Sequence, residues 1–371
     1  MPTSSAATVV EPSSASTPTL PVVNLQRWRH GSADEQKVFA DEVREICHNV
    51  GFFHLVGHEV SDDFLAKYFE LLKAFFALPQ ATKASIDKHR SPYFRGWERE
   101  GAELTNNRPD IREQLDVSSE YPPSALDASP AYLRLYGPNQ WLPEDVLPGF
   151  RRVVDEFFRS MGALADELME VFAVGLGLPR RHFVELFGAR PHSLAKLIRY
   201  PATPEGQAGV NEHHDAGFLT LLLQHGVSGL EALAPTGDWI EVEPRPDAIV
   251  VNLGEMLQEM SRNYFVATTH RVIASAERYS TAYFHGPDLS TTLDRLVLDS
   301  RFAAAVESSE RHRNAGFMAK RDELLSGNQG TFSSGAGVYG RQLWNYYVRS
   351  YPENVRVHHR DVFVPWPSSN D

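Results

Sequence analysis

Apolar positions recur every three to four residues in three stretches of the chain, a spacing that is typical of amphipathic helices. The helices predicted from this pattern cover residues 34–50, 64–76 and 150–178. Gly51 and Pro79 stand where the first two of these helices are expected to end. Short apolar runs in the same part of the chain predict strands at residues 20–25 and 52–56.

The second half of the chain changes to short apolar, β-branched and aromatic runs that turn residues separate. The predicted strands are 194–200, 219–224, 239–242, 248–252, 271–274 and 281–285. Many short strands at this spacing indicate a β-sandwich or a barrel. Residues 91–148 look irregular, and a loop of that length in a compact chain is usually functional. Residues 311–351 look mainly helical, apart from the glycine-rich stretch 327–340.

This pattern predicts a mainly β fold with flanking helices. The helices need the outer face of the sheet to pack on, so we expect one domain over residues 20–371. Its expected parts are a helix-and-strand region with a substrate loop (20–190), the β core (191–290) and a mainly helical end (291–371). Residues 1–19 are rich in Ser, Thr, Ala and Pro, a composition that predicts a disordered tail.

Composition excludes several classes of protein. The net charge is −12 and the pI about 5.7, so we expect no nucleic-acid partner. Apolar runs fall short of the roughly 18 residues that span a bilayer, so no membrane partner is expected. The one cysteine, Cys47, allows no intramolecular disulfide and fits a reducing, cytoplasmic location. It falls in a helical pattern, where buried packing is the expected role.

The most informative chemistry lies at His213, Asp215 and His270. On a strand, residues two apart point to the same face, so His213 and Asp215 are expected side by side while His214 faces away. Two imidazoles and one carboxylate suit ferrous iron and leave coordination positions open. Arg278 and Ser280 follow closely and can hold the far carboxylate of a small diacid. The alternatives are ordinary histidines among the fifteen in the chain, and a surface salt bridge for Arg278.

These motifs occur in an order that resembles the 2-oxoglutarate/Fe(II)-dependent dioxygenases of the isopenicillin N synthase-like subgroup. The matching segments are GFFHLVGH at 51–58, NEHHDAGFLTLLLQ at 211–224, VVNLGEMLQ at 250–258, THRV at 269–272 and RYS at 278–280. The resemblance covers roughly residues 20–355 and implies a double-stranded β-helix, or jelly-roll, core. The chain departs from the usual pattern at His214, where the family often has Thr or Ala, and at Ile198, where plant relatives have Asn. For His214 two roles stay open: a titratable group near the iron, or a side chain that simply faces away.

The resemblance implies roles for particular residues. His213, Asp215 and His270 would bind Fe(II), leaving room for 2-oxoglutarate and O2. Arg278 would pair with the C5 carboxylate of 2-oxoglutarate, and Ser280 and Tyr200 would add hydroxyl donors. Ascorbate is a candidate reductant.

The resemblance also suggests which residues contact the primary substrate. Residues 94–105 resemble a substrate-facing loop, with Glu103 and Thr105 as polar contacts. Arg349 and Tyr351 resemble an arginine and tyrosine over the active site of amino-acid-binding relatives, and Arg199 is expected to point inward. An alternative role for Arg349 is to neutralise acids on this negatively charged chain.

We therefore expect an enzyme that couples oxidative decarboxylation of 2-oxoglutarate to hydroxylation or desaturation of a small-molecule substrate. A carboxylated or amino-acid-like molecule from secondary metabolism is the candidate class. Two alternatives stay open. One is an iron oxidase of the same fold that does not use 2-oxoglutarate, and the other is an inert metabolite-binding protein.

Overall fold

The computed structural model describes residues 19–105, 108–204, 207–316 and 337–362. Nearly all of the expected N-terminal tail and most of the glycine-rich stretch 327–340 lie outside these ranges. Within them, no helix combines the length and the apolar composition that crossing a membrane requires.

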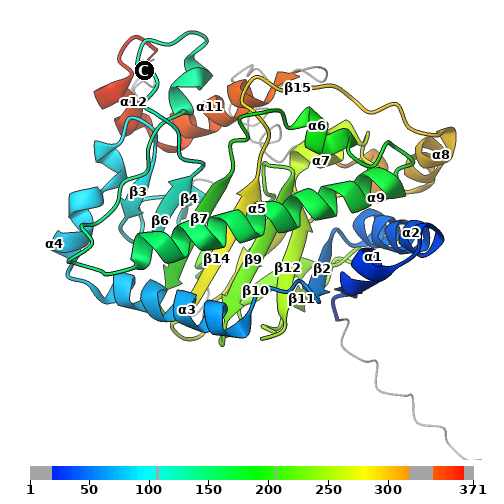
Figure 1. The fold of residues 1–371 in the computed structure, drawn as a ribbon, viewed down its shortest axis with the longest axis horizontal. Coiled ribbons are helices and arrows are strands. Elements are labelled where there is room, and N and C mark those ends of the chain that lie inside the picture. The colour runs from blue at the N-terminus through cyan, green and yellow to red at the C-terminus, as the bar shows by residue number, and fades with distance from the viewer. Residues whose placement is uncertain (1–18, 106–107, 205–206, 317–336, 363–371) are drawn as a thin grey trace, which may run out of the picture.

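Two β-sheets form the centre of the fold (Figure 1). In spatial order, the eight-stranded sheet consists of β1 (Val22–Asn24), β2 (Phe52–Val56), β12 (Ala248–Leu253), β9 (Leu219–His225), β14 (Arg278–His285), β7 (Leu194–Tyr200), β6 (Glu113–Ser118) and β3 (Gly96–Glu98). The four-stranded sheet consists of β11 (Trp239–Glu241), β10 (Leu230–Leu233), β13 (His270–Val272) and β8 (Val210–His213). Two short ribbons are β4 (Leu104–Thr105) with β5 (Arg108–Pro109), and β15 (Thr292–Leu293) with β16 (Gly337–Val338).

Helices flank this β core. They are α1 (Gln26–His30), α2 (Ala33–Asn49), α3 (Asp62–Ala77), α4 (Gln80–Lys83), α5 (Phe150–Gly175), α6 (His182–Leu186), α7 (Glu255–Met260), α8 (Ser300–Ser308), α9 (Glu310–Arg313), α11 (Tyr339–Ser350) and α12 (Pro352–His358). Three 3-10 turns are η1 (Ala84–Ile86), η2 (Lys88–Arg90) and η3 (Ala131–Leu135). The long helix α5 runs across one face of the large sheet (Figure 1).

Strand alternation divides the interior into two apolar clusters. On β7, Leu197 faces the helices and joins the large cluster that includes the buried side of α5. Ile198 and Tyr200 face the other way and pack with Val210 and Leu230 of the small sheet. This second cluster joins the two sheets into a jelly roll, so the fold predicted from the sequence is confirmed.

Local sequence explains where helix α2 begins and ends. Helix α2 begins with a capping box, in which Ser32 and Glu35 satisfy each other's backbone amides. It ends at Asn49 and is followed by Val50 and by Gly51, whose φ of 74° is a left-handed conformation that glycine adopts without strain. Cys47 is buried in α2, as predicted.

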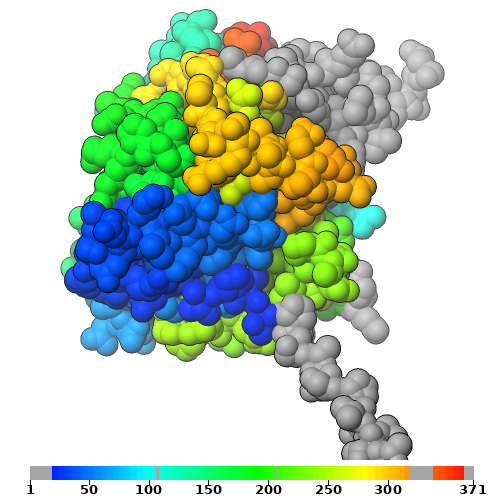
Figure 2. All heavy atoms as spheres, turned by 90° about the vertical axis from the view of Figure 1, so that its right-hand side faces the viewer, coloured from blue at the N-terminus to red at the C-terminus, as the bar shows by residue number. Residues whose placement is uncertain are grey.

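Helices α1 and α2 form one surface together with α8 and α9 (Figure 2). In α9, Arg311 and His312 donate hydrogen bonds to backbone carbonyls at the end of α2.

One prediction about the fold was wrong. Residues 91–148 are not simply a loop, because β6 lies inside the large sheet and pairs with both β7 and β3. Its polar residues Gln114 and Asp116 are buried and alternate with Leu115 and Val117. Polar residues that point into the interior made this strand resemble a loop.

Candidate metal centre

Two neighbouring strands of the small sheet bring the proposed ligands together. His213 is the last residue of β8 and His270 the first of β13, and the two are direct partners across the strands. Asp215 follows β8 rather than lying within it, so the strand predicted through both residues ends earlier. The Asp215 carboxylate nevertheless lies beside both imidazoles.

The spacing of the three side chains fits one metal ion. Asp215 Oδ1 lies 3.7 Å from His213 Nε2 and 3.6 Å from His270 Nε2. All three potential ligand atoms lie within 4.8 Å of one another. Donors about 2.1 Å from one ion and at right angles to each other would be roughly 3 Å apart, so small side-chain movements suffice to bind a metal.

The second nitrogen of each histidine is held by the backbone. His213 Nδ1 lies 2.8 Å from the carbonyl oxygen of Asn211, and His270 Nδ1 lies 3.0 Å from that of Thr268. A carbonyl can only accept, so Nδ1 carries the proton in each ring. This arrangement directs Nε2 of both rings toward the metal position.

Two neighbouring side chains orient the carboxylate of Asp215. Its Oδ2 accepts hydrogen bonds from Thr220 Oγ1 at 2.5 Å and from Asn252 Nδ2 at 2.6 Å, which leaves Oδ1 for a metal. The sequence analysis assigned no role at the site to either Asn252 or Thr220. Gly254 allows the backbone to close here, because a Cβ at this position would lie 2.1 Å from the carbonyl oxygen of Gly217.

The charge states of the three side chains suit metal binding. Burial and the neighbouring His270 lower the pKa of His213 to about 3. Burial disfavours the charged form of His270, but Asp215 beside it raises the His270 pKa above its usual 6.5. Burial alone would raise the pKa of Asp215, whereas the contact with His270 holds it well below its usual range. Metals bind neutral imidazole and ionised carboxylate, so His270 is the group that must lose a proton.

His214 faces away from the metal position, as predicted. Its Nδ1 lies 3.0 Å from Glu255 Oε1 and its Nε2 lies 2.8 Å from Thr269 Oγ1. Both ring nitrogens therefore have protein partners, and the side chain links the ligand loop to α7 and to the start of β13.

Arg278 is a buried cation that has no anionic partner among the residues that the structure describes. It is 1% exposed, and its guanidinium donates to Ser280 Oγ at 3.2 Å and to Gln224 Oε1 at 2.8 Å. It lies 5.0 Å from the centre of the Tyr200 ring, and among the described residues its Nε has no hydrogen-bond partner. Burial lowers the pKa of Arg278. An uncompensated buried guanidinium fits a carboxylate ligand, and Glu277 pairs with Arg199 instead.

The five predicted substrate residues separate into two groups. Glu103, Thr105 and Tyr351 lie in one polar network on the inner side of the large sheet. The inward orientation expected for Arg199 is wrong, because Tyr200 faces inward and adjacent residues of a strand face opposite sides. Arg349 is exposed near the end of α11, and its predicted contact with the substrate stays a prediction.

Comparisons with known proteins agree with this geometry. Residues 20–144 match the family described as non-haem dioxygenase in morphine synthesis, N-terminal, and residues 191–287 match the 2OG-Fe(II) oxygenase superfamily. A 2-oxoglutarate-dependent dioxygenase of Dothideomycetidae sp. is 30% identical over 82% of this chain and 83% of its own. The chain belongs to the 2OG-Fe(II) oxygenase superfamily. A second dioxygenase of this kind, from Didymella fabae, is 34% identical over 75% of this oxygenase and 88% of its own length.

A solved structure extends the likeness to three dimensions. A full-length Neurospora crassa protein, crystallised in complex with alpha-KG and 5-formyluracil, has a TM-score of 0.64 and 26% identity, over 75% of this oxygenase and 87% of that chain. The protein is thus an oxidoreductase that depends on Fe(II) and 2-oxoglutarate and couples decarboxylation of 2-oxoglutarate to oxidation of a small molecule. The comparisons support this prediction over an oxidase that does not use 2-oxoglutarate.

Proposed function

We propose that this oxygenase binds Fe(II) through His213, Asp215 and His270, and binds the C5 carboxylate of 2-oxoglutarate through Arg278. The observation that carries the assignment is the combination of a preorganised donor set with a buried guanidinium that forms no ion pair with any described residue. Ser280 and Gln224 already contact this guanidinium and hold its position.

Each side chain has a defined part in the reaction. When bound, Fe(II) with 2-oxoglutarate and O2 would supply the oxidant for the substrate, with succinate and CO2 as co-products and ascorbate as a candidate reductant. Arg278, with Ser280 and Tyr200, orients the diacid. Thr220 and Asn252 keep one oxygen of Asp215 directed at the metal.

We further propose hydroxylation or desaturation of a small metabolite, with Glu103, Thr105 and Tyr351 on the substrate side. The 5-formyluracil named with the solved relative supports a small-molecule substrate. The charge of −12 supports a protein without nucleic-acid or membrane partners, and the single buried cysteine supports a cytoplasmic location. The large apolar cluster runs from Val23 to Val355, which supports residues 20–371 acting as one domain.

A matched pair of histidine variants tests the metal assignment. His213→Ala should abolish iron binding and iron-dependent formation of succinate. His214→Gln changes the adjacent histidine, which faces away from the metal, and should retain both properties. If the two variants bind iron equally, the proposed ligand set is incorrect.

A further inference from the structure

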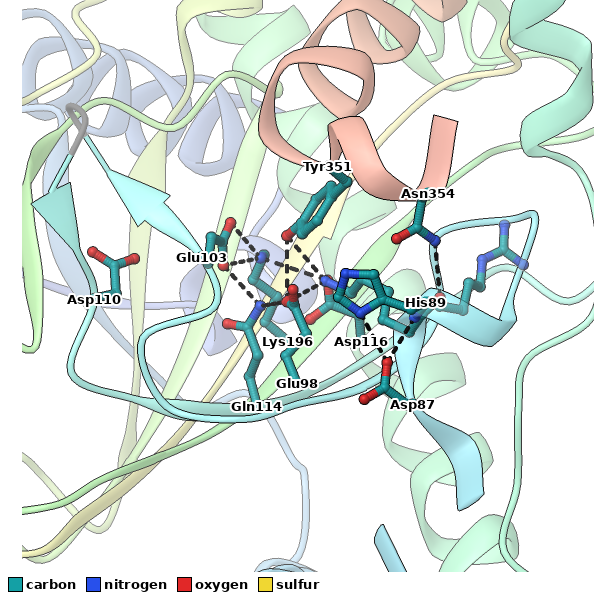
Figure 3. A network of polar contacts seen from close by, with 12 residues as sticks. Asp87, His89, Glu98, Glu103, Asp110, Gln114, Asp116, Lys196, Tyr351 and Asn354 are labelled. Atoms are coloured by element: carbon teal, nitrogen blue, oxygen red, sulfur yellow. Dashed lines mark hydrogen bonds and ion pairs between the residues drawn. The ribbon is translucent and has the colours of Figure 1, made fainter. Parts of the chain in front are cut away.

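A buried ionic cluster lies at the end of the large sheet that β3, β6 and β7 form; Figure 3 labels Glu98, Glu103, Asp110, Gln114, Asp116 and Lys196 of it. We use this name for Lys88, Glu98, Glu103, Asp110, Arg112, Gln114, Asp116 and Lys196, all of which are less than 9% exposed. Lys88 donates to Glu98, to Asp116 at 2.7 Å and to Tyr351 at 2.9 Å. Glu103 accepts from Lys196 at 2.8 Å, Arg112 at 2.6 Å, Gln114 at 2.7 Å and Tyr346 at 2.9 Å.

The register of the strands places this cluster on the same face as the 2-oxoglutarate contacts. Lys196 and Tyr200 lie on one face of β7, four residues and therefore about 13 Å apart. Tyr200 is the cross-strand partner of Arg278, and Lys196 is the partner of Asp116. The β4 strand, next to Glu103, contacts β8, which ends at the metal ligand His213.

The cluster has more hydrogen-bond acceptors than donors. Four buried oxygens have no partner among the described residues: Glu98 Oε1, Asp110 Oδ1, Gln114 Oε1 and Asp116 Oδ1. Arg112 Nε is the one unpartnered donor of the cluster within the same ranges. Four carboxylates against three cations also leave a net formal charge of −1.

A purely structural role does not explain this excess. Buried ion pairs rarely stabilise a protein more than apolar residues of the same size would. A buried acceptor without a donor is destabilising in itself. Such a cluster is better suited to a ligand that supplies the missing donors and the missing positive charge.

We propose that the buried ionic cluster recognises a protonated nitrogen group, such as an amine or amidine, on the primary substrate. This inference rests on the proposed function and adds the charge of the substrate to it. Arg349, which is exposed on α11, takes no part in this inference. Glu98 on β3 and Asp116 on β6 are the principal specificity residues, because each is a carboxylate on a strand of the large sheet with one buried oxygen that has no hydrogen-bond partner among the described residues.

Three probes of similar shape test the sign of the charge. The intact protein is loaded with Fe(II) and 2-oxoglutarate without oxygen and titrated in a calorimeter with benzylamine, benzyl alcohol or benzoate. Benzylamine, a cation at neutral pH, should bind at least about tenfold more tightly than benzyl alcohol, a difference of roughly 1.4 kcal/mol. Equal affinities, a preference for benzoate, or no binding of benzylamine would overturn the proposal.

Variants then locate the effect. Glu98→Gln and Asp116→Asn should bring the ratio of benzylamine to benzyl alcohol affinity close to one, whereas Glu100→Gln, an exposed acid on the same segment, should leave it unchanged. The visible absorption band of iron-bound 2-oxoglutarate is recorded in every sample. A missing band in the unaltered protein would count against the proposed function, whereas a normal band with no preference for the cation would count against this inference alone. The comparison of probes uses the unaltered protein, so it does not depend on how the variants fold.

Discussion

Replacing Arg278 with methionine should weaken the binding of 2-oxoglutarate without lowering the stability of the protein. Within the part of the chain that the structure describes, the hydrogen-bond partners of the guanidinium include the neutral side chains of Gln224 and Ser280, and no carboxylate forms an ion pair with it. Losing a buried charged partner of a carboxylate costs about 2–5 kcal/mol of binding energy, so the Kd for 2-oxoglutarate should rise by roughly 30-fold to several thousand-fold. In the ligand-free protein, the variant leaves Gln224 without its donor, which costs about 1–3 kcal/mol. It also removes an uncompensated buried cation, a gain of several kcal/mol.

Arg278→Met should therefore bind 2-oxoglutarate poorly and yet be no less stable than the unaltered protein. Binding is measured by anaerobic titration with 2-oxoglutarate, and stability by urea unfolding of the metal-free protein without 2-oxoglutarate. Arg199→Met, an arginine on the neighbouring strand that faces away from the site, serves as the control and should keep full affinity. An Arg278→Met protein with normal affinity and a stability lowered by more than about 2 kcal/mol would refute the reasoning and assign Arg278 a structural role.

Three further predictions concern the metal site and the response to pH. Asn252→Leu should weaken iron binding by about 10- to 100-fold because Asp215 loses a hydrogen bond that orients it, and an unchanged iron titration would argue against this. Iron binding at pH 6 should release more protons than at pH 8, because the pKa of His270 lies above 6.5 before the metal binds; calorimetry in two buffers measures the difference, and equal release would contradict it. Burial and His48 lower the pKa of His312 to about 4, so the unfolded chain binds more protons and the free energy of unfolding should fall as the pH drops from 6.5 toward 4. His312→Gln should show a shallower fall in urea titrations, and an identical slope would exclude His312 as the cause.

The proposed metal ligands could be predicted from the sequence because their chemistry is local and unusual. Two histidines and an aspartate in this order, followed by Arg278, have few other uses, and the structure brings the three proposed ligands together. The residues that orient them were harder to find. Thr220 and Asn252 occupy inward positions on β9 and β12, and their contact with Asp215 depends on how those strands pair.

The residues proposed to contact the primary substrate could not be predicted from the sequence in the same way. Lys88 and Lys196 resemble surface lysines in the sequence, because their carboxylate partners come from segments up to about a hundred residues away. The pairing of β6 with β7 and β3 brings these lysines and their carboxylate partners together in the interior, and the sequence alone does not show that pairing. The error at Arg199 was avoidable, since an inward Tyr200 requires its neighbour on the strand to face outward.

The most direct test of the central claim is an anaerobic titration of the purified protein, first with Fe(II) and then with 2-oxoglutarate. The account predicts the weak visible absorption band of iron-bound 2-oxoglutarate, and its loss in His213→Ala and in Arg278→Met at the same ligand concentrations. Iron that binds without producing the band when 2-oxoglutarate is added would contradict the account and indicate an oxidase that takes its electrons from elsewhere.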